Sequence, residues 1–278
     1  MRRERVSDDI YVFTSDLYAQ VTASAVVTQE GIVVIDTLPY PEETSLMIEY
    51  LEGLGRGRIR YLINTHWHGD HTHGNFLFRG VQLVCHQRCA DALLELGAPA
   101  LGESREASPE LAEVELVVPD ITFDQGEMLL HLGEKSLQVV FTPGHTHDST
   151  VVYVKEDKVM IAADTVMPLP YFVWGSREDF INSLQSILEF NLESIVQGHG
   201  EVLLRGEIRE AIQGNIRYLN VIHKRVSRVI ETGGGVEALL RIDVESCGRS
   251  RIPLNGLVQD LHQANLHSLY QQMIGETA

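Results

Sequence analysis

The chain has 278 residues, enough for one large domain with a sizeable core, and its 44% hydrophobic and 22% charged content is typical of globular proteins. The formal net charge of −17 disfavours nucleic acids and anionic membranes as partners, because polyanions attract basic surfaces. Three cysteines are too few for a disulfide framework, no apolar run approaches the roughly 18 residues that cross a bilayer, and no apolar segment follows "MRRERV", so we expect a cytoplasmic protein.

Short runs rich in Val, Ile and Thr predict strands in the first half of the chain. These strands are expected at 10–14, 20–28, 31–36, 60–65 and 81–85. A helix is predicted over 41–54, where Pro41 suits the first turn and Leu and Met residues mark one face. A shorter helix is predicted over 87–96, and residues 97–125, which show no clear period, predict a loop with a short helix.

The second half of the chain repeats this order of strands followed by helices. Strands are predicted at 137–142, 149–154, 158–163 and 194–197. Helices are predicted at 177–190, 207–231 and 256–274. The glycines at 233–235 separate the last two helices. Two similar batches of strands and helices predict a layered α/β sandwich over residues 1–205, with a helical segment over 206–278 packed on the same domain.

One polar segment, "NTHWHGDHTHGN", directly follows the predicted strand 60–65. It is either a solvated turn or half of a metal site, and its histidines and aspartate are His66, His68, Asp70, His71 and His73. The order of strand, then His or Asp, then turn recurs at His145, Asp164 and His199. Strands that end at one edge of a core would bring such residues together, and this recurrence favours a metal site over a polar turn.

Histidine and aspartate together suit a borderline divalent ion such as zinc, and also iron or manganese. Seven candidates are too many for one tetrahedral ion and are about right for two ions that share a ligand. A carboxylate can bridge two ions through its two oxygens, so Asp164 is the natural bridge. The candidate ligands are His66, His68, Asp70, His71, His145, Asp164 and His199.

The segments "HWHGDH", "PGHTHDSTVVYV", "AADT" and "QGHGEV" resemble, in order, the motifs of the metallo-β-lactamase superfamily over about residues 10–205. The resemblance implies an αββα four-layer sandwich with two metals at one edge of the sheets and a helical C-terminal extension. By the matching motifs, the first metal would be held by His66, His68 and His145, and the second by Asp70, His71 and His199, with Asp164 bridging. Because residue 164 is Asp and not Cys, the chain looks like the glyoxalase II and lactonase branches and not the β-lactamases with a cysteine ligand.

This resemblance implies an enzyme that holds two zinc ions and uses a metal-bridging hydroxide to cleave a small-molecule ester, lactone, thioester or β-lactam-like amide. Asp70 would also orient the attacking water, and the Tyr171 hydroxyl would donate to the developing oxyanion. The alternatives are an iron enzyme like the persulfide dioxygenases of this scaffold, a phosphodiesterase, and a non-catalytic module stabilised by metal. The expected partner is a small molecule.

The aromatic segment 167–176 has two open interpretations. It forms an apolar wall of the pocket, or it packs under the C-terminal helices or at a homodimer contact. Asp36 is either a partner of a ligand histidine or a turn cap. Three positions depart from the resemblance: His73 and Ala163, which stand where glycine is usual, and the extra imidazole of His147.

Other candidate residues remain without an assigned role. His147 adds an imidazole beside His145, and its contribution is open. Trp67 either touches substrate or covers the ligand loop. The segment "CHQRC" predicts buried thiols at a strand end more readily than a soft-metal site. No chemistry is assigned to the scattered histidines His86, His131, His223, His262 and His267.

Overall fold

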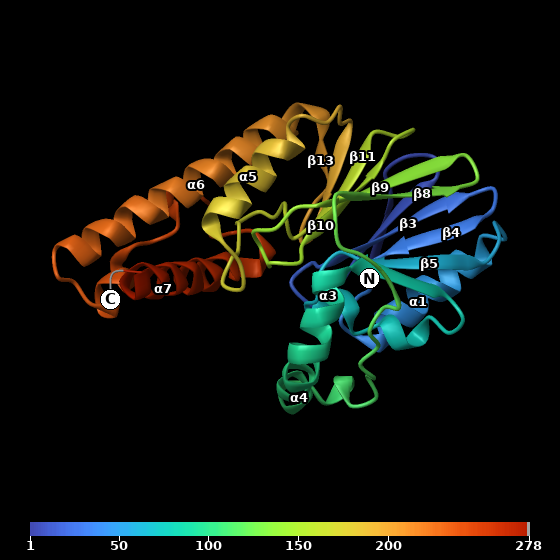
Figure 1. The fold of residues 1–278 in the computed structure, drawn as a ribbon, viewed down its shortest axis with the longest axis horizontal. Coiled ribbons are helices and arrows are strands. Elements are labelled where there is room, and N and C mark those ends of the chain that lie inside the picture. Colours follow the sequence, from blue (N-terminus) through green and yellow to red (C-terminus); the bar gives the residue numbers. More distant parts are fainter. Residues whose placement is uncertain (277–278) are drawn as a thin grey trace.

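The computed structural model describes residues 1–276 and contains two β-sheets (Figure 1). In spatial order the first sheet is β1 (Arg2–Arg5), β2 (Ile10–Thr14), β3 (Thr22–Thr28), β4 (Gly31–Ile35), β5 (Ile59–Asn64), β6 (Gln82–His86) and β7 (Ile121–Phe123). The second sheet is β13 (Leu203–Leu204), β12 (Ser194–Gln197), β11 (Val159–Ala163), β10 (Thr150–Val154), β9 (Lys135–Phe141) and β8 (Glu127–Leu132).

Alternating side chains on the central strands create three apolar layers. In β4, Val33 and Ile35 face the other sheet, whereas Ile32 and Val34 face a helix on the outside. The inner layer also receives Val152 from the second sheet. Apolar residues therefore occur on both faces of these strands, which explains why the sequence shows continuous runs of Val and Ile instead of strict alternation.

Helices cover the outer faces of both sheets and complete an αββα sandwich (Figure 1). The α-helices are α1 (Pro41–Gly53), α2 (Gly69–Thr72), α3 (Gln87–Ala92), α4 (Ala98–Ala107), α5 (Arg177–Ile187), α6 (Arg205–Glu231) and α7 (Val258–Glu276). The 3₁₀ and π segments are η1 (Asn75–Leu77), η2 (Leu93–Gly97), η3 (Pro109–Leu111), η4 (Val236–Arg241), η5 (Glu245–Cys247) and η6 (Leu254–Gly256). Helix α1 packs on the first sheet, and α5 and α6 pack on the second.

The C-terminal helices share one apolar core with the second sheet. Ile212 and Leu219 of α6 and Leu266 of α7 belong to the same buried cluster as Met160 of β11. Helices α6 and α7 extend away from the sheets at one side (Figure 1). The shared core shows that this segment packs on the sandwich, and the boundary after residue 205 stays a prediction. In the part of the chain described, no helix combines the length and apolar character needed to span a bilayer.

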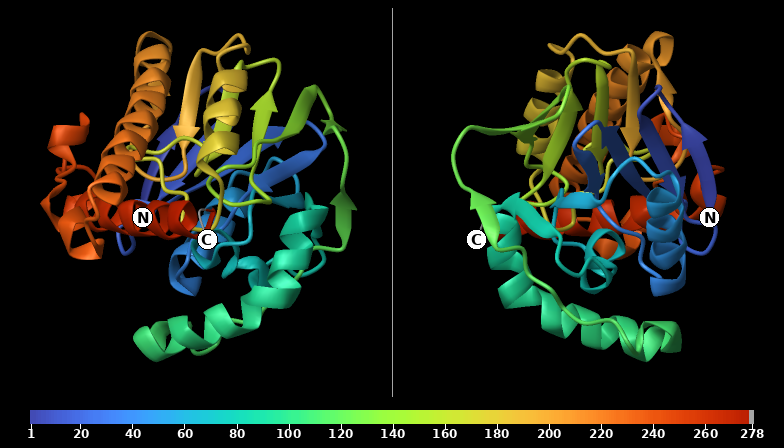
Figure 2. Two further views of the ribbon diagram at one scale, coloured as in Figure 1. Left: turned by 60° about the vertical axis from the view of Figure 1, so that its left-hand side comes forward. Right: turned by 90° about the vertical axis from the view of Figure 1, so that its right-hand side faces the viewer.

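Residues 97–125, for which the sequence predicted a loop with a short helix, contain more helix than expected. The helix predicted over 87–96 continues through η2 into α4, which ends at Ala107. Pro99 does not prevent this, because it lies in the first turn of α4, where its missing N–H needs no partner. Figure 2 shows α3 and α4 as an arm that leaves the sandwich and passes beneath it. Short or edge strands were also missed, namely β1, β7, β8 and β13.

The strand directions explain how the predicted site residues meet. Strands β11 and β12 are parallel, and β9 runs in the same direction because β10 is antiparallel to both β9 and β11. The segments that follow β9, β11 and β12 therefore leave the second sheet at the same edge. The first sheet joins this edge through hydrogen bonds from Thr150 N–H to the Thr65 carbonyl and from Thr22 N–H to the Gly198 carbonyl.

Candidate metal centre

The histidine-rich segment after β5 supplies four of the predicted ligands. His66 and His68 lie in the turn, and the one-turn helix α2 carries Asp70 and His71. His71 is fully buried, and its carbonyl accepts the N–H of Thr37. This contact ties α2 to the segment after β4 and fixes the direction in which both α2 side chains point.

The first group of donor atoms consists of three imidazoles and one carboxylate. His68 Nδ1 lies 3.2 Å from His66 Nε2 and 2.9 Å from His145 Nε2. His145 Nε2 lies 3.2 Å from Asp164 Oδ2. One donor atom from each of these four residues falls within a cluster whose members all lie within 4.8 Å of one another.

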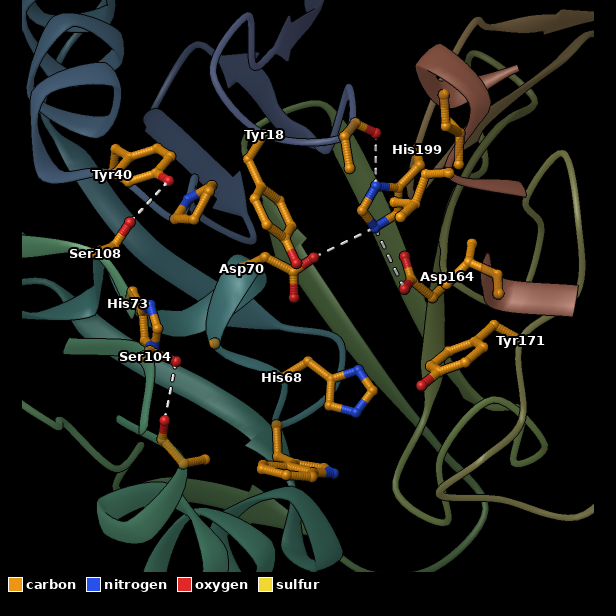
Figure 3. Close-up of a pocket in the computed structure, with 18 of the residues that line it drawn as sticks. Tyr18, Tyr40, His68, Asp70, His73, Ser104, Ser108, Asp164, Tyr171 and His199 are labelled. Atoms are coloured by element: carbon orange, nitrogen blue, oxygen red, sulfur yellow. Dashed lines mark hydrogen bonds and ion pairs between the residues drawn. The ribbon is translucent and has the colours of Figure 1, made fainter. Parts of the chain in front are cut away.

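The second group consists of Asp70, His71 and His199, again within 4.8 Å of one another. His199 Nε2 lies 3.3 Å from Asp70 Oδ2 and 3.5 Å from Asp164 Oδ2. The other oxygen of the shared carboxylate, Asp164 Oδ1, lies 3.2 Å from His71 Nε2. Asp164 therefore faces both groups, and Figure 3 shows it beside His199 at the floor of a pocket.

The chemistry of these donors fits cations. Ring nitrogens of His66, His68 and His145 point at one another. A single proton cannot satisfy all three nitrogens, whereas a metal ion between them would accept a lone pair from each. His71 Nε2 and Asp164 Oδ1 are buried and make no hydrogen bond, despite their short separation. Buried polar atoms are rarely left without partners, so a cation between them accounts for both observations.

The pKa values of the histidines also point to a need for positive charge. Burial lowers the pKa of His68 to about 3 and holds that of His66 well below its ordinary value. Burial also acts to lower the pKa of His199, but Asp164 and Asp70 outweigh it and raise the value to about 10. Two buried carboxylates thus hold a proton on His199, at a point where a bound cation would balance the same charge.

Asp36 contacts the candidate ligand His71, which agrees with the first of its two interpretations, a partner of a ligand histidine. His71 Nδ1 donates to Asp36 Oδ2 across 3.1 Å, and the same oxygen accepts the hydroxyl of Thr65 at 2.7 Å. Asp36 Oδ1 accepts the Thr65 N–H at 2.8 Å. The carboxylate therefore links the ends of β4 and β5 and fixes the tautomer of His71, leaving Nε2 free for a metal.

Two other candidate ligands are oriented by backbone carbonyls. His145 Nδ1 donates to the Tyr171 carbonyl at 2.6 Å, and His199 Nδ1 donates to the Ala19 carbonyl at 2.9 Å. Ala19 belongs to the β2–β3 loop, and its φ of 43° lies in the left-handed region, which L-residues seldom adopt. Sequence reasoning missed this loop, because a backbone acceptor leaves no mark in the residue type.

The turn that carries Asp164 is crowded. Ala163 has a φ of 42°, which lies in the left-handed region that favours glycine. A Cβ added at Gly198 would lie 1.9 Å from Asp164 Oδ1. The glycine of "QGHG" thus makes room for the shared carboxylate, a role that its place beside His199 did not reveal.

A pocket of about 450 Å³ opens over both groups. Tyr171 and Trp174 line it, whereas Phe172 is buried among the C-terminal helices, so both interpretations of 167–176 hold for different side chains. Trp67 also lines the pocket and packs edge-on against Trp174, with ring centroids 5.6 Å apart. Tyr18 lines it as well, and the negative charge of Asp70 is the main reason why the pKa of the Tyr18 phenol is raised.

The two extra histidines have different surroundings. His73 lines the pocket and is 8% exposed, and its ring packs so closely on Gly69 that a Cβ there would lie 2.3 Å from Nε2. His147 is exposed, and its carbonyl accepts a hydrogen bond from Arg88.

Cys85 and Cys89 are buried free thiols, as expected.

Asp148, close to this site, predicts a pH dependence of stability. Burial raises its pKa from 3.8 to about 6, a rise of roughly two pH units that corresponds to about 3 kcal/mol. Because the pKa of Asp148 is higher in the folded than in the unfolded protein, the contribution of the protonated carboxyl to the free energy of unfolding is fully present below pH 4. This contribution is lost as the pH rises through 6. The free energy of unfolding of the Asp148→Asn protein, relative to the unaltered protein, should therefore rise between pH 4 and pH 7.5 in urea titrations. A difference that stays constant over this range would contradict the prediction.

The family model of the metallo-beta-lactamase superfamily matches residues 18–199. The chain belongs to this superfamily. Among curated relatives, it is 25% identical over 186 residues to a beta-lactamase-like protein 2 homolog from Caenorhabditis elegans, covering 67% of this chain and 56% of the relative. It is also 25% identical over 192 residues to the lactamase-like protein adaB from Aspergillus niger, covering 65% and 51%. The chain thus spans about half the length of these relatives.

Solved structures of low identity share the fold. A metallo-beta-lactamase from Pontibacter korlensis is 20% identical, with a TM-score of 0.64 over 76% of this chain and 97% of that chain. The sec-alkylsulfatase Pisa1 from Pseudomonas sp. is 15% identical, with a TM-score of 0.77 over 98% of this chain and 50% of that chain. The second match extends through the C-terminal helices, so the αββα sandwich and its helical extension occur together elsewhere.

Proposed function

We propose that the chain is a dinuclear, zinc-dependent hydrolase that cleaves an ester, lactone, thioester or β-lactam-like amide bond in a small molecule. The observation that carries the proposal is the position of Asp164, whose two oxygens face the two groups of imidazoles across 3.2 Å on each side. One cation would be held by His66, His68 and His145, and the other by Asp70, His71 and His199. Asp164 would bridge them.

The bound cations would supply a water whose pKa falls from about 15.7 toward about 7, together with a Lewis acid for the substrate oxygen. The chain itself provides position and charge. Asp70 lines the pocket, where its carboxylate would accept a hydrogen bond from the attacking water and hold that water beside the substrate. The carbonyls of Tyr171 and Ala19 hold His145 and His199 in fixed orientations, so the geometry does not have to reorganise during the reaction.

Tyr171 is proposed as the hydrogen-bond donor to the oxyanion. Figure 3 shows its side chain at the rim of the pocket near Asp164, and burial together with Asp70 raises the phenol pKa, so the hydroxyl keeps its proton at neutral pH. The Tyr171→Phe protein should lose about 10- to 100-fold in kcat with little change in KM, because the donor acts mainly in the transition state. Steady-state kinetics test this, with Tyr153→Phe as control, because the Tyr153 hydroxyl donates to the Asn191 carbonyl and does not line the pocket. An unchanged kcat would remove Tyr171 from the mechanism.

The experiment that tests the proposed function is metal analysis of the purified protein, followed by a panel of lactone, thioester, β-lactam and phosphodiester substrates. Two zinc ions per chain and hydrolysis of a carbonyl substrate without oxygen uptake support the proposal. One iron per chain with oxygen uptake would replace it with a persulfide-dioxygenase-like reaction. Turnover of the phosphodiester alone would assign a phosphodiesterase.

A further inference from the structure

One side of the pocket comes from outside the part of the chain that the family model matches. Leu254, Leu257 and Leu261 line it, and all three belong to the segment that comprises η6 and the start of α7. The family model ends at residue 199. The C-terminal segment therefore contributes an apolar wall to a site whose candidate ligands all lie before it.

This wall is held firmly in place by buried contacts. Leu254 is buried in the core that α6 and α7 share with the second sheet, and Leu257 and Leu261 pack against the same core. Asn265 of α7 accepts the N–H of Phe172 at 3.1 Å and donates to the Pro170 carbonyl at 2.7 Å. These contacts fix the wall to the loop that carries Tyr171, so the shape of the pocket is set before a ligand binds.

The opposite side of the pocket carries uncharged polar groups among apolar ones. Figure 3 shows Tyr40, Ser108, Ser104 and His73 together on the side away from Tyr171. The Tyr40 hydroxyl lies 3.3 Å from Ser108 Oγ, and Ser104 Oγ donates to the Ala100 carbonyl. These groups can form hydrogen bonds with a neutral polar substituent but provide no full positive charge.

Among the described residues that line the pocket, none is lysine or arginine. Its charged side chains are the carboxylates of Asp70 and Asp164 and the imidazole of His199, and all three belong to the proposed metal centre. A carboxylate carried by a substrate at a distance from the scissile bond would lie against leucines, without a cationic partner. Burying an unpaired carboxylate is strongly unfavourable, so such a substrate should bind weakly.

We propose that the C-terminal segment selects substrates whose group distal to the scissile bond is uncharged and apolar, and that it rejects substrates with a carboxylate there. This inference rests on the proposed hydrolase function, because it assumes that the scissile bond lies at the metal centre. It narrows that function to neutral, apolar acyl compounds. Anionic substrates with a remote carboxylate are excluded.

The test compares the binding of two matched ligands to the zinc-loaded protein by calorimetry. Octanohydroxamate and its analogue with a terminal carboxylate have the same chain length and the same metal-binding group. We expect the uncharged ligand to bind at least about tenfold more tightly. In the Leu257→Lys protein the preference should shift by at least about tenfold toward the carboxylate, because a cation then lies on the wall.

Three variants control this comparison. Leu257→Met keeps an apolar wall and should keep the preference of the unaltered protein. Leu240→Lys adds the same charge at a residue that is 72% exposed and does not line the pocket, and it should also leave the preference unchanged. If Leu257→Lys fails to fold, as judged by thermal melting, Leu261→Lys provides the same test from the next turn of the wall.

Equal binding of the two ligands to the unaltered protein would overturn the inference, and so would an equal shift in the Leu240→Lys and Leu257→Lys proteins. The measurement requires no turnover. A failure of the hydrolase proposal would therefore appear in the substrate panel, whereas a failure of this inference would appear in the ratio of the two affinities.

Discussion

The Asp164→Ala protein is expected to lose kcat/KM by at least about a thousandfold for every substrate that the unaltered protein hydrolyses. The reason is the position of the carboxylate, which lies 3.2 Å from His145 on one side and from His71 on the other. Without it neither group of imidazoles retains a shared anionic ligand, and the bound metal should fall below two ions per chain. Kinetics and elemental analysis of the same preparation measure both losses.

The control for this variant is Asp8→Ala, which removes a carboxylate that is 98% exposed and remote from the pocket. It should leave metal content and kinetics unchanged. If Asp164→Ala retained turnover of every active substrate, the catalytic assignment of this carboxylate would be wrong, even if the metals were still bound.

A second large effect is expected from the Gly198→Ala protein, in which only one methyl group is added. The new Cβ would lie 1.9 Å from Asp164 Oδ1 and 2.5 Å from the carbonyl carbon of Ala163, so the carboxylate or the backbone must move. We expect metal affinity to fall by about 10- to 100-fold, as when the support of a ligand is lost. Competition with a chromophoric chelator measures this affinity.

Gly206→Ala is the matched control, because a Cβ at this position of α6 meets no atom within 4 Å. It should bind metal as the unaltered protein does. Thermal melting of both variants in excess chelator separates a local effect from a general loss of stability. Unchanged metal affinity in the Gly198→Ala protein would show that Asp164 can shift without harm to the site.

The sequence predicted the central strands, because most of them are short runs rich in Val and Ile, and several, such as β4 and β11, are buried on both faces. Strand β12 lies at 194–197 as predicted, and α5 starts at Arg177 as predicted. The prediction failed for β1, β7, β8 and β13. These strands lie at or next to sheet edges, where one face is exposed and residues such as Arg2 and Glu127 replace apolar ones.

The first half of the arm, α3, was predicted, but α4 was missed for a different reason. Residues 98–107 contain proline and glycine, which usually interrupt helices, and few of their side chains are buried. Pro99 is tolerated because it occupies the first turn. Local composition therefore did not predict α4, although residues of this helix line one side of the pocket.

The candidate ligands were predictable from the sequence because each follows a recognisable strand and has a side chain with metal-binding chemistry. Asp36 was left between two interpretations, since its contact with His71 spans 35 positions of the chain. The carbonyl of Ala19 could not be predicted, because every residue carries a backbone carbonyl and only folding selects one.

The amino-acid sequence by itself determined the superfamily, the kinds of donor atom and the order in which they follow the strands. Tertiary structure alone decided the pocket, by bringing Tyr18, Ser104 and Leu257 to three sides of one cavity. The physical reason is that ligand positions depend on local strand ends, whereas the walls depend on how distant apolar surfaces pack. Packing of this kind joins segments that are distant in the sequence and leaves no periodic signal in any of them.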